Sequence, residues 1–156
     1  MCDSEQRSQD EFWMRKALDE ARYAMSIGEV PVGAVVVRNG EVISTGYNRR
    51  ETDHRAIAHA ELLAMDEACR KLGRWRLNDC TLYVTLEPCP MCAGVTVNAR
   101  MGRVVYGAKD AKAGAMGSVL DVRAYPLNHK ADVVSGVLAE ECATVLREFF
   151  EDKRGR

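Results

Sequence analysis

The sequence lacks a hydrophobic run long enough to cross a membrane, since no stretch approaches the ~18 uninterrupted apolar residues that a span requires. The N-terminal segment MCDSEQRSQDEFW is acidic and polar, whereas a secretory signal would be basic and then apolar. We therefore expect a cytoplasmic protein with no membrane contact.

An excess of charge of either sign is also lacking, because 22 Lys and Arg residues balance 23 Asp and Glu residues to a net charge of −1. Overall charge thus neither indicates nor excludes a nucleic-acid partner. Basic side chains do gather in one region of the chain, namely Arg49, Arg50, Arg55, Arg70, Lys71, Arg74 and Arg76. This group could form a phosphate-binding face or an ordinary solvated surface.

Internal repeats, low-complexity segments and linkers are absent. At 156 residues and 47% hydrophobic content, the sequence predicts one domain over 1–156, with tails at about 1–7 and 153–156. A chain of this length buries about 68–70% of its unfolded surface, so it needs no disulfide or metal merely to fold. A metal site in this chain would therefore indicate chemistry.

The six cysteines could in number form three disulfides. A reducing compartment and a core of this size favour free thiols or metal ligands instead. Of the six, only Cys89 and Cys92 are spaced for a shared task.

Segments of helical and strand periodicity alternate along the chain. Ser8 and Glu11 form a capping-box pattern before a helical run that ends at Gly28, and Asn39-Gly40 is a strong hairpin signal. We expect helices over 8–28, 59–73, 90–99 and from 139 onward, and strands over 32–37, 41–47, 81–85, 103–107 and 132–135. The strand–helix–strand unit over 81–107 should be parallel. This order predicts an α/β fold: a three-layer α/β/α sandwich with a mixed five-stranded sheet.

Two short motifs at predicted helix starts carry metal-binding residues. In a helix, Cys89 and Cys92 lie on one face and can reach one ion, and a helix N-terminus favours the thiolates that zinc needs. His59 would be the third ligand. Three protein ligands leave a tetrahedral Zn²⁺ with one open position, which is typical of a catalytic site.

Glu61 stands two residues after His59, and residues two apart in mid-helix point about 200° away from each other. Both can serve one site only if His59 precedes the regular helix. A carboxylate beside the ion, but not bound to it, can accept a proton from the activated water and pass it to a substrate.

Each motif alone has a simpler explanation. A lone CxxC is also found in structural zinc sites and redox pairs, and a lone HxE is usually an ordinary helix start. Together, H-x-E and P-C-x-x-C form the signature of the zinc deaminases.

Beyond this signature, the sequence resembles the bacterial tRNA-specific adenosine deaminases of the TadA type. The resemblance covers roughly residues 10–154. It rests on five segments: 30–34 (VPVGA), 47–49 (YNR), 58–61 (AHAE), 85–94 (TLEPCPMCAG) and 110–114 (DAKAG).

The resemblance implies a cytidine-deaminase-like fold and hydrolytic deamination of adenosine to inosine at the wobble position of an arginine tRNA anticodon. It assigns Glu61 as the proton shuttle and a Zn²⁺ ion to His59, Cys89 and Cys92. It places Asn48, Val32, Leu86 and the Ala60 backbone around the base, and Asp110, Lys112, Asn128 and Phe149 near flanking nucleotides of the anticodon stem-loop. It also implies a homodimer that pairs through residues 95–100.

One departure from the family pattern concerns the C-terminus, where Glu151 and Asp152 stand in place of residues that are often basic. This weakens the expected RNA contact there. Two other interpretations remain: a zinc deaminase of a free base or nucleoside (cytosine, cytidine or guanine), and a non-enzymatic zinc scaffold. The presence of Glu61 speaks against the scaffold, which has no need of a proton shuttle.

Overall fold

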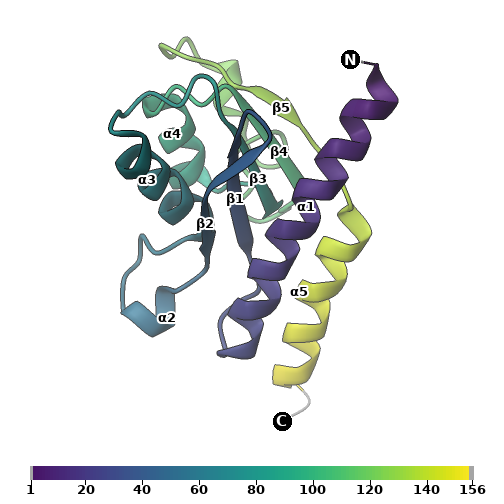
Figure 1. The fold of residues 1–156 in the computed structure, drawn as a ribbon. Coiled ribbons are helices and arrows are strands. Elements are labelled where there is room, and N and C mark those ends of the chain that lie inside the picture. Colours follow the sequence, from purple (N-terminus) through teal and green to yellow (C-terminus); the bar gives the residue numbers. More distant parts are fainter. Residues whose placement is uncertain (1, 155–156) are drawn as a thin grey trace.

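The computed structural model describes residues 2–154, and five strands in this part form one mixed sheet of order β2-β1-β3-β4-β5 (Figure 1). The strands are β1 (Gly33–Arg38), β2 (Glu41–Tyr47), β3 (Thr81–Leu86), β4 (Arg103–Ala108) and β5 (Asp132–Val134). β1 pairs antiparallel with both β2 and β3, while β3, β4 and β5 are parallel. Each strand lies within one residue of its predicted bounds.

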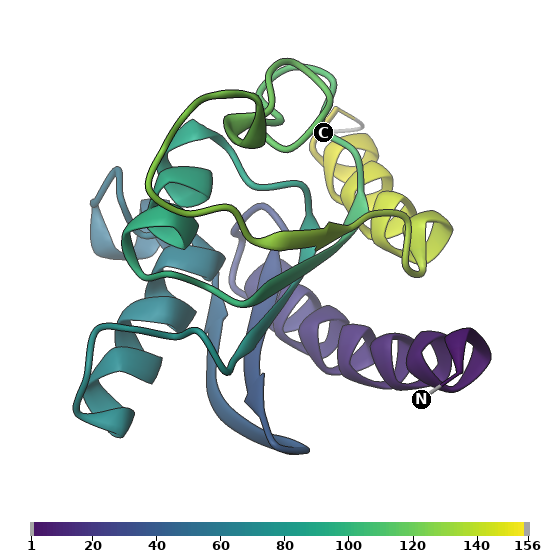
Figure 2. The same ribbon diagram turned by 90° about the horizontal axis from the view of Figure 1, so that it is seen from above.

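Helices cover both faces of the sheet, which confirms the three-layer prediction (Figures 1 and 2). α1 (Asp3–Ser26) and α5 (Ala139–Arg154) lie on one face, and α3 (Ala60–Leu72) and α4 (Pro90–Asn98) lie on the other. Because both faces are covered, the central strands are buried on both sides. Val35 and Tyr83 face α1, whereas Val36 and Val84 pack on the α3 side.

The hairpin predicted at Asn39-Gly40 joins β1 to β2, and both turn residues are exposed. Their φ angles of 50° and 75° match a type I′ turn, whose twist suits two antiparallel strands.

At the opposite end of β1, several segments meet at one sheet edge. β1 begins beside the end of β3, where the Gly33 N–H donates to Thr85 Oγ1 at 3.2 Å. The end of β2 lies there too, because Tyr47 is the register partner of Gly33. The carboxyl end of a strand that leads into a helix is a common place for a binding site in α/β sheets.

An ion pair between Asp10 and Arg103 links α1 to the first residue of β4, away from this edge of the sheet. Asp10 is 2% exposed, and its carboxylate accepts two hydrogen bonds from Arg103 at 2.7 Å each and one from the Tyr83 hydroxyl at 2.8 Å. Burial opposes ionisation of Asp10, but these hydrogen bonds outweigh it and hold its pKa below the ordinary range.

Several predicted boundaries are wrong. α1 begins at Asp3, with Cys2 as N-cap and no side-chain capping bond, so Ser8 and Glu11 lie inside the helix and residues 3–7 are not a tail. Asp3 and Glu5 favour this earlier start, because acidic side chains stabilise the positive N-terminal end of a helix. α5 continues through Arg154, so 153–154 are helical, while residues 1, 155 and 156 lie outside the described residues.

Two short elements were not predicted, α2 (Arg50–Asp53) and a 3₁₀ turn, η1 (Val122–Ala124). The six cysteines are free, as expected. Over residues 2–154, none of the helices combines the length and the apolar character that a membrane span requires.

Candidate metal and catalytic centre

Two helix starts place the metal-binding side chains. His59 is the N-cap of α3 and Cys89 is the N-cap of α4, both with extended backbone, and Pro90 occupies the first turn of α4. His59 thus precedes the regular helix, which confirms the condition on which a shared site with Glu61 depends. A Cβ at Gly46 would overlap the Ala60 carbonyl oxygen, so glycine in β2 allows the start of α3 to lie against the sheet.

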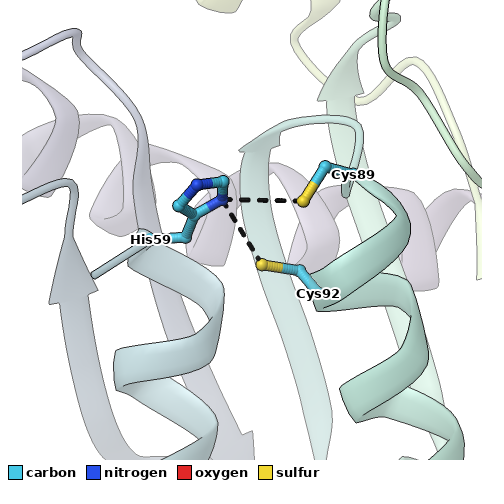
Figure 3. Close-up of side chains that lie close together, drawn as sticks. All are labelled: His59, Cys89 and Cys92. Carbon is cyan, nitrogen blue, oxygen red and sulfur yellow. Dashed lines mark hydrogen bonds between the residues drawn. The ribbon is translucent and has the colours of Figure 1, made fainter. Parts of the chain in front are cut away.

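The three donor atoms converge (Figure 3). His59 Nδ1 lies 3.6 Å from Cys89 Sγ and 3.6 Å from Cys92 Sγ. A tetrahedral zinc with Zn–N of about 2.0–2.1 Å and Zn–S of about 2.3 Å separates its nitrogen and sulfur ligands by about 3.6 Å. The donor set and its spacing therefore fit zinc. Among residues 2–154, no other group of three His, Cys, Asp or Glu side chains is placed for a metal ion.

The two thiols of the site differ in acidity. Hydrogen bonds from Cys92 and His59 stabilise the Cys89 thiolate and lower its pKa to about 3. The Cys92 thiol, as the donor in this pair and buried, has its pKa raised. Hydrogen bonding to Cys89 raises the pKa of His59. An ion bound by all three residues would have to displace the Cys92 proton.

Glu61 lies in the first turn of α3 and lines the same pocket as His59 and Cys89. The residue is only 4% exposed, and burial raises the pKa of its carboxyl group to about 7. A carboxyl group with a pKa near the working pH can both accept and release a proton.

The pocket beside these residues has a volume of about 210 Å³, below the range of about 300–1,000 Å³ typical of drug-sized ligands, so it suits a single small ring system. Five further residues named from the sequence line it: Val32, Asn48, Ala60, Leu86 and Asp110.

Asn48 is held in place at the pocket wall. Its Nδ2 donates to the Val30 carbonyl at 3.2 Å, and its Oδ1 accepts from the Arg50 N–H at 3.1 Å. An amide offers two N–H groups and two lone pairs, so each end of Asn48 retains capacity for one more hydrogen bond.

Three residues named from the sequence do not line this pocket. Lys112 and Asn128 are exposed on loops. Phe149 is buried in α5, where its ring packs edge-on against Phe150. Their proximity to RNA stays a prediction.

Ion pairs neutralise part of the basic group around 49–76. Arg49 pairs with Asp53, Arg70 with Asp66 and Glu67, and Arg74 with Asp79. The Arg76 guanidinium lies over the exposed Trp75 ring. Within the group, Arg50 is the residue that reaches the pocket wall.

Four other lining residues were not assigned from the sequence: Val30, Arg50, Glu87 and Ala113. Val30, Glu87 and Ala113 belong to the quoted family segments, but nothing in their spacing indicates a pocket. Arg50 is placed by a long-range contact: buried Glu29 accepts hydrogen bonds from the Glu51 and Thr52 N–H groups at the start of α2.

Comparison with known proteins places residues 8–154 within the family of MafB19-like deaminases. The chain is 54% identical over 148 residues to the tRNA-specific adenosine deaminase of Bacillus subtilis (strain 168), a match that covers 94% of the chain and 92% of the relative.

Two solved structures are similar over most of the chain. One comes from a study of A-to-I editing by tRNA:A34 deaminases at the wobble position of transfer RNA, with a TM-score of 0.84 and 44% identity over 86% of this chain and 99% of that chain. The other is a guanine deaminase from Nitrosomonas europaea, with a TM-score of 0.75 and 26% identity over 89% and 83% of the two chains.

Proposed function

The chain belongs to the deaminase family that includes the tRNA-specific adenosine deaminases, and on this premise we propose that it hydrolyses adenosine to inosine at the wobble position of a tRNA anticodon. The observation that carries the proposal is the convergence of His59, Cys89 and Cys92 beside buried Glu61, in a pocket sized for one ring system.

His59, Cys89 and Cys92 would hold a Zn²⁺ ion, since their donor types and 3.6 Å separations suit tetrahedral coordination. When bound, zinc supplies an activated water, whose pKa falls from 15.7 to about 7 on coordination.

Glu61 moves the protons of the reaction. It accepts a proton from the attacking water as the C–O bond forms at C6 of adenine, and it delivers that proton to N1. It then takes the remaining proton from the new C6 hydroxyl and passes it to the departing amine as the C–N bond breaks, so that ammonia leaves and inosine, with a C6 carbonyl, remains. A positioned acid–base group of this kind contributes about 10²–10⁴ in rate.

The pocket walls orient the base. Val32 and Leu86 would pack against its two faces, and the remaining hydrogen-bonding capacity of Asn48 would be directed to its edge. The Ala60 backbone lies beside the reacting edge.

The substrate extends beyond this pocket. Asp110, Lys112, Asn128 and Phe149 would meet nucleotides that flank the wobble base, and a homodimer in the cytoplasm would be the working unit. An unpaired loop base can be extruded without breaking a base pair, so binding energy is available to orient C6.

One assay tests this function: ammonia release and inosine formation from a stem-loop carrying the wobble adenosine of an arginine tRNA, beside free adenosine, cytidine and guanine. We expect turnover of the stem-loop with a kcat/KM that falls as salt rises, because phosphate contacts become screened. Comparable, salt-insensitive turnover of a free base or nucleoside would favour the second candidate, a metabolite deaminase, for which the similar guanine deaminase fold is the supporting observation.

A further inference from the structure

Glu87 is a buried carboxylate directly after β3, two residues before Cys89, and is 2% exposed. Both of its carboxylate oxygens accept hydrogen bonds from one loop. Oε1 accepts from the Asp110 N–H at 3.1 Å and from the Ser118 hydroxyl, and Oε2 accepts from the N–H groups of Met116 at 3.0 Å and Ser118 at 3.1 Å. All four donors belong to the segment 110–118, which we call the 110–118 loop.

Gly114 lies against this carboxylate within the loop. A Cβ at Gly114 would overlap the carboxyl group of Glu87. The φ of Gly114 is outside the left-handed region, so its backbone conformation suits any residue. Glycine is therefore needed here for the close approach to Glu87 and not for the shape of the chain.

The 110–118 loop forms part of the pocket wall through Asp110 and Ala113. The Asp110 side chain accepts from the N–H groups of Lys112 and Ala113, and the Ala115 N–H donates to the Pro88 carbonyl. The segment 87–89 thus carries the Cys89 ligand on one side and fixes the 110–118 loop on the other.

We propose that Glu87 is a positioning residue for substrate binding: its carboxylate holds the 110–118 loop against the pocket so that the loop meets the substrate beyond the reacting base. This inference rests on the proposed function, since a free base would not reach the outer part of the loop. With both oxygens occupied, Glu87 acts through the loop and not by contact with the reacting atoms.

An ionised carboxylate suits this task because it only accepts hydrogen bonds. Glu87→Gln keeps the size of the side chain but replaces one acceptor with a donor that would face the loop N–H groups. Since a buried donor without a partner is unfavourable, we expect the loop to move away from the pocket.

The test compares Glu87→Gln with Asp10→Asn, a matched control in which the neutralised carboxylate is equally buried but lies outside the pocket. Hydrogen–deuterium exchange should show lost protection of the amides of Asp110, Met116 and Ser118 in Glu87→Gln alone. For the wobble-adenosine stem-loop, KM should rise about tenfold while kcat stays within about twofold, because the loop binds ground state and transition state alike. Zinc content should be unchanged.

Gly114→Ala breaks the same contact from the other side and should reproduce both the lost amide protection and the raised KM. Unchanged loop protection in Glu87→Gln, loss of zinc, a fall in kcat at constant KM, or an equal rise of KM in Asp10→Asn would overturn the proposal. Because amide exchange requires no substrate, a wild-type protein inactive on the stem-loop would contradict the proposed function separately.

Discussion

At the scale of single residues, the two cysteines of the candidate metal site differ in acidity, and Cys92 must lose a proton before it can bind an ion. Hydrogen bonds from Cys92 and His59 lower the pKa of Cys89 to about 3, whereas hydrogen bonding to Cys89 and burial raise the pKa of Cys92. Metal binding should therefore release a proton and weaken as pH falls.

We predict one zinc ion per chain, lost or greatly reduced in Cys89→Ser and Cys92→Ser, because no other trio among residues 2–154 can replace these donors. Elemental analysis of the purified proteins measures it. Cys69→Ser is the matched control, since Cys69 is a half-buried thiol outside the cluster and its replacement should leave zinc content unchanged. Full zinc occupancy in either ligand variant would contradict the assignment.

We predict that Glu61→Gln folds and binds zinc but loses more than about 10²-fold in turnover, because the amide preserves the shape of the side chain and removes its proton-accepting charge. Inosine formation under single-turnover conditions, with zinc measured on the same sample, provides the test. Near-normal turnover of a zinc-loaded variant would show that another group is the base.

At the scale of helices and strands, periodicity predicted the elements that pack against the sheet. The part of α1 from residue 8 onward was predicted from the apolar spacing of Met14, Ala17 and Leu18, and these three side chains are buried in the structure. Its first turns were missed because residues 3–9 are polar on every side and show no period. α2 was missed because it has four residues and depends on Glu29, which lies far from it in sequence.

The residues of the candidate site also differ in whether the sequence alone could predict them. His59, Glu61, Cys89 and Cys92 were predictable because metal chemistry requires these residue types at short spacings. The role of Glu87 was not, because its partners follow it by 23 to 31 residues and only the fold brings them together.

The start of α3 depends on the absence of a side chain at Gly46. We predict that Gly46→Ala lowers the free energy of unfolding by about 1–3 kcal/mol, as overpacking typically does, and also weakens zinc binding, because the Cβ would displace the segment that carries His59. Denaturant unfolding and a competitive zinc chelator measure the two effects. Gly102→Ala is the control: it is equally crowded, by the Asn78 carbonyl, but away from the pocket, so it should lose stability and keep zinc affinity.

At the scale of the whole molecule, the Asp10–Arg103 pair links α1 to the sheet, and its contribution depends on pH. The folded pKa of Asp10 lies below its unfolded value of about 3.9, so the stabilisation is complete above that pH and is lost as pH falls through the folded pKa. We predict that Asp10→Asn lowers the free energy of unfolding by about 1.5–3 kcal/mol at pH 7, and that the difference from wild type shrinks as the pH falls through the folded pKa of Asp10. Urea unfolding at several pH values checks this, and a pH-independent difference would contradict it.

We also predict a homodimer that pairs through residues 95–100, which form the second half of α4 and the two residues after it. Gly94 on α4 adjoins these residues, and beyond its chain neighbours and the nearby backbone of its own helix a Cβ there would meet no atom within 4 Å, so the single chain has room for a side chain that a partner would encounter. Wild-type protein should scatter light as twice the 17.3 kDa of one chain, whereas Gly94→Gln should be monomeric with unchanged or higher stability, since glycine is unfavourable inside a helix. Monomeric wild-type protein with full activity on the stem-loop would overturn the prediction.

The β1–β2 turn is a suitable position at which to attach a label or a tag to the enzyme. Asn39 and Gly40 are exposed at one end of β1, and Gly33 at the other end adjoins the edge that carries the pocket. Six strand residues at about 3.3 Å each separate the two ends by about 20 Å. A fluorescent dye or an affinity tag inserted at this turn should therefore leave the pocket open, so that binding of an RNA hairpin could be followed on immobilised or labelled protein.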